Sequence, residues 1–480
     1  MKPRITLLES QDIKLRKFLD SHPKGHERAA IVLFRRLHRP IQGLDDSDRY
    51  IAVDVIPFVD DWIVHSSSAH VNFDLKYLRD AFRRCEEEKL VFGFAHNHPT
   101  GYPDFSETDE ENERTLLQAI VNRNGRNIHF VALLLTNGQW KARVRHGESP
   151  HPISTRHTLV LGDHLTMYGY EESEYDDDTI HARQAAAFGQ PFVDMLRSLR
   201  VGIVGCGGTG SPTITLLARA GIGELVLIDN DLLEKTNLNR VRGSRLEDVG
   251  KNKALILGDF IRSLGLSVQI STIQSLIDED PNALDAISSC DVIFGCTDDQ
   301  LGREVLNTSL YVYAQALIDI GLGGQIAQDK EGQPYLRYHQ GRISTVLPEA
   351  GECLLCQGVI KDKWIRHQQE LRKNPDLSIE EAEQRYLEGS GEQAPGVGPF
   401  TSATADNGVA NLFNLLRPFR RIPGHLREDL YFIDFVKMEI WSKESTNNSE
   451  CPYCGTNDYL LLREKYRLNR PMLGKAHVYL

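Results

Sequence analysis

Residues 200–229 read RVGIVGCGGTGSPTITLLARAGIGELVLID, and this stretch decides the fold of the C-terminal part of the chain. An apolar, β-branched run meets a glycine-rich turn, a segment with the 3.6-residue apolar period follows, and a second apolar run ends at Asp229. This order predicts a strand, a phosphate-binding turn, a helix and a second strand. Glycine is needed because the backbone turns tightly and lets phosphate oxygens approach the N–H groups at the positive N-terminus of the helix. The glycines of the turn are Gly205, Gly207, Gly208 and Gly210.

Asp229 can accept hydrogen bonds from a ribose, so the glycines and this acid alone favour an NAD-type Rossmann site. The residues that follow favour a triphosphate instead. Asp231, Asn237 and Arg240 place a carboxylate, an amide and a guanidinium beyond the nucleotide, and arginine offers forked donors to phosphate oxygens. Lys253 adds a second cation, and Asp298 follows the apolar run DVIFG, where a carboxylate at a strand's C-terminal end is suited to Mg²⁺.

Together these residues resemble the adenylating enzymes of the ThiF, MoeB and ubiquitin-activating superfamily, over roughly residues 180–480. The resemblance implies a Rossmann-like α/β domain with a mostly parallel sheet, which binds ATP and Mg²⁺ and adenylates the C-terminal glycine carboxylate of a ubiquitin-like protein. Asp229 then holds the ribose, Asp298 organises Mg²⁺, and Arg240 and Lys253 neutralise charge as pyrophosphate leaves.

The segment HARQAAAFGQPFVDMLRSLRV, residues 181–201, resembles the helix that precedes the first strand in this superfamily. In that superfamily the Arg-Gln pair of this helix supplies an arginine to the active site of the opposite protomer. The resemblance therefore assigns this role to Arg183 and implies a homodimer. The alternative is that Arg183 is an ordinary surface arginine.

Composition narrows the class of protein. The chain has 480 residues, of which 41% are hydrophobic and 25% charged, and it can form two or three domains with sizeable cores. A formal net charge of −12 argues against nucleic-acid and anionic-membrane partners. No apolar run reaches the ~18 residues of a membrane span, and the N-terminus lacks a signal-peptide core, so we expect a cytoplasmic protein.

Four of the eight cysteines form two C-x-x-C pairs, Cys353/Cys356 and Cys451/Cys454. In a reducing compartment such pairs favour a tetrahedral structural zinc site over disulfides. A redox motif or a coincidence is the alternative. The superfamily resemblance supports zinc, because many members hold this part of the fold together with such an ion.

The segment HNHPTGYPDFSETDEEN, residues 96–112, predicts a second metal site. His96 and His98 share one face of an extended segment, and Ser106 caps a helix whose first turn contains Asp109. Two histidines and an aspartate leave a fourth zinc position for water, which is typical of a catalytic site. The base that such chemistry requires is assigned to Glu27, at the head of an early strand. A plain capping box and a surface histidine pair are the alternatives.

Joined in this order, these residues resemble the JAB (JAMM, MPN-type) zinc metalloproteases, which cleave after the C-terminal glycine of ubiquitin-like proteins. The resemblance covers about residues 1–150, which we expect to form an α+β domain, followed by a linker over 151–179. It implies that His96, His98 and Asp109 bind zinc, that Glu27 is the general acid and base, and that Ser106 stabilises the oxyanion.

The sequence thus predicts a bifunctional enzyme that processes or deconjugates a ubiquitin-like protein and also adenylates it. Its partners are that protein and a separate conjugating enzyme or a sulfur or amine acceptor, because no cysteine lies where conjugating relatives carry one, between Cys356 and Cys451. By analogy, such fusions occur in bacterial conjugation systems, some of which serve antiviral defence. Two alternatives stay open, namely an NAD-dependent oxidoreductase fused to a metal hydrolase and a catalytically decayed scaffold.

Overall fold

The computed structural model describes residues 2–147, 149, 151–173, 179–373, 396–420, 429–443 and 448–461. The chain folds as two compact units, Met1–Pro40 with Asp45–Ser173, and Ile41–Leu44 with Glu174–Leu480. None of the described helices combines the length and the hydropathy that a membrane crossing requires.

The first unit is built on a nine-stranded mixed sheet with the order β11-β10-β1-β3-β2-β6-β7-β8-β9. A separate two-stranded hairpin, β4 and β5, accompanies it. The elements are β1 (Arg4–Leu8), α1 (Glu9–Leu19), β2 (Ala29–Leu37), β3 (Arg49–Pro57), η1 (Asp60–Trp62), β4 (Ile63–Ser66), β5 (Val71–Phe73), η2 (Leu75–Leu78), α2 (Arg79–Glu88), β6 (Val91–Asn97), α3 (Glu107–Asn124), β7 (His129–Thr136), β8 (Gln139–His146), β9 (Ile153–Ser154), β10 (His157–Leu161) and β11 (Leu165–Tyr168).

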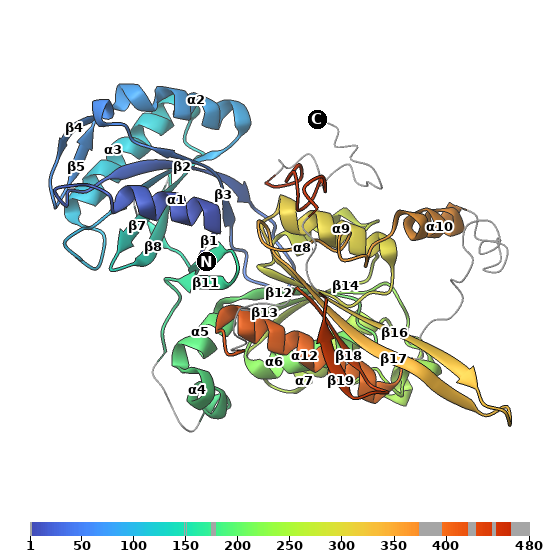
Figure 1. Cartoon of the computed structure of the whole chain (residues 1–480). Coiled ribbons are helices and arrows are strands. Elements are labelled where there is room, and N and C mark those ends of the chain that lie inside the picture. Colours follow the sequence, from blue (N-terminus) through green and yellow to red (C-terminus); the bar gives the residue numbers. More distant parts are fainter. Residues whose placement is uncertain are drawn as a thin grey trace. The chain divides into compact units, whose positions relative to one another are not determined.

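Helices cover both faces of this sheet, with α1 on one side and α2 and α3 on the other (Figure 1). Successive residues of a strand point to opposite faces, so β2 supplies both cores. Val32 and Phe34 pack with Leu15 of α1, whereas Ile31 and Leu33 belong to the core with α2 and α3. The central strands are consequently buried on both sides, and the segment AAIVLFRRL forms the strand that its apolar run predicts.

The segment that we expected to be a linker, residues 151–179, contains three strands instead. β10 is buried throughout and pairs in parallel with β1, with His157 opposite Arg4. β11 then pairs antiparallel with β10, and β9 pairs with β8. The apolar run of β10 therefore completes the sheet of the first unit, which extends beyond residue 150.

The second unit contains an eight-stranded sheet with the order β14-β13-β12-β15-β16-β17-β18-β19 (Figure 1). Its first five strands are parallel and the last three are antiparallel, so the sheet is mixed. The elements are α4 (Ala182–Phe188), α5 (Gln190–Ser198), β12 (Arg200–Val204), α6 (Gly210–Ala220), β13 (Glu224–Ile228), η3 (Lys235–Asn237), η4 (Leu246–Asp248), α7 (Lys253–Ser263), β14 (Gln269–Ile273), α8 (Pro281–Ser288), β15 (Val292–Gly295), α9 (Gln300–Val312), β16 (Ala316–Gln328), β17 (Pro334–Val346), α10 (Asp362–Lys373), α12 (Gly398–Leu416), β18 (Leu430–Asp434) and β19 (Glu439–Ser442).

The parallel part has the predicted strand, turn, helix and strand at its centre, as β12, α6 and β13. The strand order reverses beside β12, because β13 and β15 lie on its two sides. Such a switch point leaves a crevice at the carboxyl ends of the strands, where α/β proteins bind ligands. The long hairpin of β16 and β17 projects from the second unit (Figure 1), and residues of both strands line the pocket described below.

Candidate functional site

A pocket of about 840 Å³ lies at the carboxyl ends of the parallel strands of the second unit. Nine of the residues that the sequence assigns to the nucleotide line it, namely Gly205, Gly207, Gly208, Asp229, Asp231, Asn237, Arg240, Lys253 and Asp298. They come from the three connections that follow β12, β13 and β15, and the second of these ends at Lys253, the first residue of α7. The parallel topology brings them together, because every parallel strand ends at the same edge of the sheet.

The glycine turn between β12 and α6 excludes side chains at two positions. Gly205 has φ +93°, and a Cβ there would lie 2.6 Å from the backbone carbonyl carbon of Cys296. A Cβ on Gly210 would lie 1.9 Å from the carbonyl oxygen of Gly205. These contacts explain why Gly210 is needed although it does not line the pocket itself. The N-terminus of α6 has no side-chain cap, so its N–H groups are available to an anion.

Asp229 holds the turn and the following loop together. Its Oδ2 accepts a 2.6 Å hydrogen bond from the backbone N–H of Cys206, and its Oδ1 accepts one of 2.7 Å from that of Asp231. Burial raises the pKa of Asp229, although these two bonds lower it. The carboxylate is thus fixed in orientation at the end of β13, where a ribose would meet it.

Two cations, Lys253 and Arg240, line the pocket. The Nζ of Lys253 lies 2.8 Å from Oδ2 of Asp231, and Asn252 caps α7 directly before it. Arg240 donates from Nη1 to the carbonyl oxygen of Thr236 at 2.8 Å, and the side chain of Asn237 is buried. Lys253 and Arg240 are therefore preorganised by short local contacts and do not form a pair with each other.

The two acids after β15 have different roles. Asp299 caps α9, accepting hydrogen bonds from the N–H groups of Leu301 and Gly302 at 3.3 and 2.8 Å. Asp298 is exposed in the pocket and has no ion pair or hydrogen bond among the described residues. The capping carboxylate is occupied, which leaves Asp298 as the acid available to a divalent cation.

The structure adds pocket residues that the sequence reasoning did not assign. Arg303 of α9 lies 3.4 Å from the fully buried Asp319 of β16 and faces the pocket. The hydroxyl oxygen of Ser275 is buried without a partner among the described residues and also lines the pocket. Other additions are Tyr338, Trp364, Gln368 and Thr401.

Arg303 could have been found from the sequence, because it lies in the first turn of the helix that follows Asp298. Tyr338 and Trp364 come from a hairpin and a helix whose packing against the pocket leaves no local sequence signal. Arg183, in α4, is exposed and does not line the pocket of its own chain.

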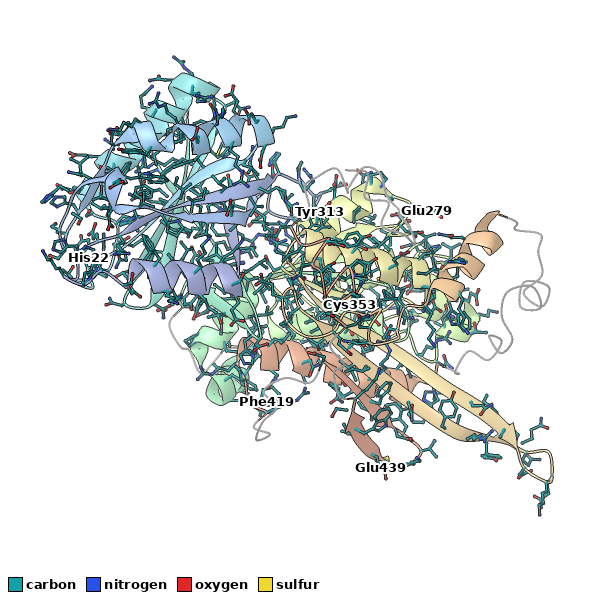
Figure 2. The ribbon with its side chains drawn as sticks, turned by 45° about the horizontal axis from the view of Figure 1, so that its top comes forward. His22, Glu279, Tyr313, Cys353, Phe419 and Glu439 are labelled. Carbon is teal, nitrogen blue, oxygen red and sulfur yellow. The ribbon has the colours of Figure 1, made fainter. Side chains whose placement is uncertain are left out.

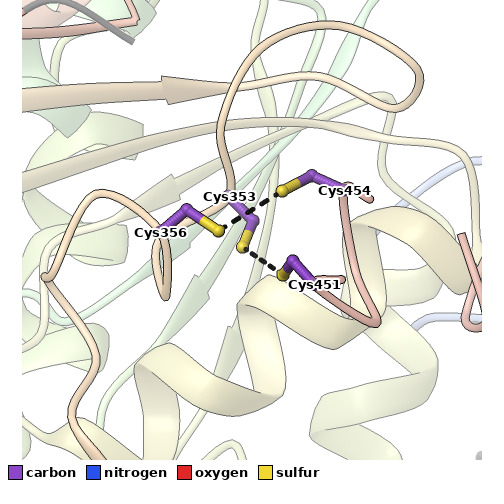
Figure 3. A group of neighbouring side chains, drawn as sticks. All are labelled: Cys353, Cys356, Cys451 and Cys454. Carbon is purple, nitrogen blue, oxygen red and sulfur yellow. Dashed lines mark hydrogen bonds between the residues drawn. The ribbon is translucent and has the colours of Figure 1, made fainter. Parts of the chain in front are cut away.

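The four paired cysteines converge in the second unit although they are far apart in the sequence (Figure 3). The sulfurs of Cys353 and Cys451 are 3.6 Å apart, and those of Cys356 and Cys454 are also 3.6 Å apart. All four sulfurs lie within 4.8 Å of one another. These separations are too long for disulfides, and they suit a tetrahedral zinc site, in which Zn–S bonds of about 2.3 Å place the sulfurs about 3.8 Å apart.

A second group of metal-ligating side chains lies in the first unit, where β6 approaches the N-terminus of α3. Nε2 of His96 is 3.0 Å from Oδ1 of Asp109, and Nε2 of His98 is 3.2 Å from Oδ2 of Asp109. All three residues are buried, and the Nδ1 of His96 has no hydrogen-bond partner among the described residues. The Nδ1 of His98 contacts the carbonyl oxygen of Tyr102 at 3.2 Å, which turns its Nε2 toward Asp109.

Two further predicted residues adjoin these three. Oε1 of Glu27 lies 3.9 Å from Nε2 of His98, and its side chain is only 2% exposed. Burial raises the pKa of Glu27 to about 7, although the nearby histidines lower it. Ser106 caps α3 and donates from its hydroxyl to Oδ2 of Asp109 at 2.8 Å. The set of two imidazoles, a carboxylate and a nearby second carboxylate fits a zinc ion with an open position.

The fold and the pocket define a Rossmann-like α/β protein with an added antiparallel half-sheet and a candidate cysteine metal site. Residues 181–453 match the ThiF family, so the chain belongs to the ThiF family. The resemblance noted for the C-terminal part of the sequence is thereby confirmed.

Three relatives illustrate the likeness. The SAMP-activating enzyme E1 of Haloferax volcanii is 37% identical over 112 residues, which are 23% of this chain and 41% of that protein. The sulfur carrier protein ThiS adenylyltransferase of Escherichia coli is 32% identical over 127 residues, 26% of this chain and 50% of that protein. Protein HesA, heterocyst, of Trichormus variabilis is 22% identical over 273 residues, 56% of this chain and 85% of that protein. The chain thus spans half or less of the length of the first two.

Proposed function

We propose that the second unit adenylates the C-terminal carboxylate of a ubiquitin-like or sulfur carrier protein with ATP. The observation that carries this proposal is the pocket in which a glycine turn, Asp229, two cations and an unpaired Asp298 face one another. Family membership supports it, and one of the relatives is named as a sulfur carrier protein adenylyltransferase and another as a SAMP-activating enzyme E1.

The reaction joins the carrier to the α-phosphate of ATP. A carboxylate oxygen of the carrier attacks the α-phosphorus, the bond from that phosphorus to the bridging β-phosphate oxygen breaks, and pyrophosphate leaves. The N-terminus of α6 binds phosphate oxygens, and Asp229 holds the ribose. Arg240 and Lys253 stabilise the charge that develops on the departing pyrophosphate.

The polar side chains that line the pocket fit a magnesium ion beside the triphosphate, and Asp298 would hold that ion. When bound, Mg²⁺ neutralises phosphate charge and orients the leaving group. The Lys253 and Asp231 pair keeps the ammonium aimed into the pocket before substrate arrives. Arg183 of a second copy would add a further cation, which is why we propose a homodimer for this activity.

ATP–pyrophosphate exchange tests the adenylation proposal. The full chain is incubated with ATP, Mg²⁺, labelled pyrophosphate and each of a panel of ubiquitin-like carriers that end in glycine. We expect exchange with at least one carrier and none with the same carrier lacking its last glycine. Reduction of NAD without exchange would instead support the oxidoreductase alternative.

We propose a second activity for the N-terminal part of the chain, as a zinc-dependent peptidase that exposes or releases the carrier's C-terminal glycine. The buried His96, His98 and Asp109 support it, because their ligand atoms lie within 4.8 Å of one another and Glu27 stands beside them. We propose that the first unit, with its limit at Ser173 in place of residue 150, carries the peptidase, and that the second unit carries adenylation.

The residues around the three ligands have separate tasks. When bound there, zinc makes hydroxide available near neutral pH and polarises the scissile carbonyl. Glu27 takes a proton from water and later passes it to the leaving amine, at Oε1 or Oε2. The hydroxyl of Ser106 donates to Oδ2 of Asp109 at 2.8 Å, and a hydroxyl in this position can turn to donate to an oxyanion.

Cleavage of a carrier fused through its C-terminal glycine to a reporter protein tests the peptidase. We expect a product that ends in glycine, inhibition by a chelator and recovery with Zn²⁺.

A cytoplasmic protein of this kind would supply its own adenylation substrate, and a separate protein would then accept the activated carrier. The four cysteines of the second unit would hold a structural zinc in the same chain.

A further inference from the structure

Two arginines of β8 join the sheet of the first unit to α3. Side chains fill the space between this sheet and the helices that cover it (Figure 2). Residues alternate along a strand, so Val144 packs in the core with α1, whereas Arg143 and Arg145 point to the face of α3. Both arginines contact Glu110 and Glu113 of α3. The side chains of Arg145 and Glu113 are only 1% and 2% exposed, and charges are buried in this way only where they are paired.

Arg143 uses both its nitrogen atoms and its flat face. Its Nε donates to the two carboxylate oxygens of Glu113 at 3.1 and 3.0 Å, and its Nη2 donates to Oε1 of the same group at 2.9 Å. Its Nη1 lies 2.8 Å from Oε1 of Glu110. The guanidinium lies over the ring of Phe105, with Cζ 3.9 Å from the ring centroid. A planar guanidinium can pair with carboxylates and stack on a ring at once, which an ammonium group cannot do.

Phe105 in turn lies beside His96, one of the three candidate zinc ligands, with ring centroids 6.1 Å apart. A histidine that binds a metal is usually oriented by a hydrogen bond at its other ring nitrogen, and His98 has such a contact with the carbonyl oxygen of Tyr102. The Nδ1 of His96 has no hydrogen-bond partner among the described residues. Its imidazole is therefore oriented by the rings packed around it, those of Phe94 and Phe105.

We infer that Arg143 is a positioning residue for the proposed zinc site and that it orients two of the ligands, His96 and Asp109. It acts on the histidine through the ring of Phe105. It acts on the aspartate through Glu110, the next residue in the first turn of α3. This inference rests on the proposed peptidase function, because it concerns the affinity of that site for zinc.

The zinc affinity of the full chain tests this inference without relying on peptidase activity. Metal analysis counts the bound ions, and competition with a chromophoric chelator measures the dissociation constants. His96→Ala identifies the zinc held by the candidate site, because the zinc proposed for the four cysteines should remain bound in that variant. Arg143→Lys keeps the positive charge but loses the forked pairing and the contact with the ring. We expect it to weaken zinc binding at this site about 10- to 100-fold.

Variants of Phe105 test the path through the ring. Phe105→Leu keeps an apolar side chain but removes the surface on which the guanidinium stacks, so it should weaken zinc binding in the same range. Phe105→Tyr keeps the aromatic ring and should retain the native affinity. This rescue separates orientation of His96 from a general loss of packing.

Arg145→Lys is the matched control for Arg143→Lys. The Nε of Arg145 lies 2.7 Å from Oε2 of Glu113, and its Nη2 lies 2.7 Å from Oε2 of Glu110, so it shares both carboxylates. Within the described part of the chain it stacks on no aromatic ring. Arg145→Lys should therefore lower the melting temperature as far as Arg143→Lys does, yet leave the zinc affinity unchanged.

The outcomes distinguish this inference from the function on which it rests. Native zinc affinity in Arg143→Lys or Phe105→Leu, or an equal loss of affinity in Arg145→Lys, would overturn the inference and leave the zinc site standing. If His96→Ala removes no zinc from the chain, the proposed zinc site itself is wrong, and the inference falls with it.

Discussion

Replacing Gly207 with alanine separates nucleotide binding from folding. Gly207 lines the pocket, its φ is not positive, and a Cβ built on it meets no atom within 4 Å. The methyl group would therefore enter only the space that the proposed phosphate occupies. A hydrogen bond to a charged group contributes about 1.5–3 kcal/mol, so losing one should raise the KM for ATP about 10- to 100-fold. We expect the melting temperature to stay unchanged.

Gly265→Ala is the matched control, which should change stability without changing nucleotide binding. Gly265 has φ +69°, with no atom within 4 Å of a built Cβ, and it does not line the pocket. Alanine in this left-handed conformation costs roughly 1–2 kcal/mol, so this variant should melt earlier while keeping its KM for ATP. ATP–pyrophosphate exchange at varied ATP and differential scanning fluorimetry provide the two readouts. An unchanged KM in Gly207→Ala, or a melting temperature that falls as far as in Gly265→Ala, would refute the reasoning.

Three further predictions concern the proposed chemistry. Glu27→Gln should abolish cleavage of the carrier fusion and leave ATP–pyrophosphate exchange intact, whereas Asp298→Asn should do the reverse; joint loss in either variant contradicts independent sites. Cys353→Ser should lose one equivalent of zinc and melt earlier, because a four-cysteine site contributes folding free energy, and a fully stable variant with unchanged zinc content argues against it. Finally, the chain should form an acyl-adenylate but no stable thioester, since burial raises the pKa of Cys296, the cysteine that lines the pocket, to about 12. A thiol-sensitive band on a non-reducing gel, lost in Cys296→Ala, would show the opposite.

The nucleotide pocket could be anticipated because its residues follow strands. Asp229 and Asp298 are far apart in the chain, yet each comes soon after an apolar run, and parallel strands bring such positions to one edge. The group of His96, His98 and Asp109, which could hold a metal ion, could also be predicted from the sequence, since the H-x-H spacing and the cap at Ser106 are local patterns. The position of Glu27 beside these side chains depends on the pairing of β2 with β6. The spacing of residues in the sequence does not specify that pairing.

Other features depend on tertiary contacts that leave weak local signals. Trp364 reaches the pocket from α10, and Tyr338 reaches it from the middle of a long hairpin. The segment HTLVL of β10 is only five residues long and follows two closely spaced prolines, Pro150 and Pro152, so it did not stand out as a strand. Its partner β1 is about 150 residues away, and such non-local pairing cannot be read from a window of sequence.

The pairing of β10 with β1 places the beginning and the end of the first unit side by side. A module whose ends meet can be joined to another chain, or cut from one, without distorting its interior. A fragment of the first unit must, however, include its last strands, β10 and β11. A fragment that stops at residue 150 would lack β10 and β11 and leave the buried β1 as an open edge, prone to aggregate. A fragment that extends to Ser173 retains the whole sheet and is the one to express for biochemistry on the first unit alone.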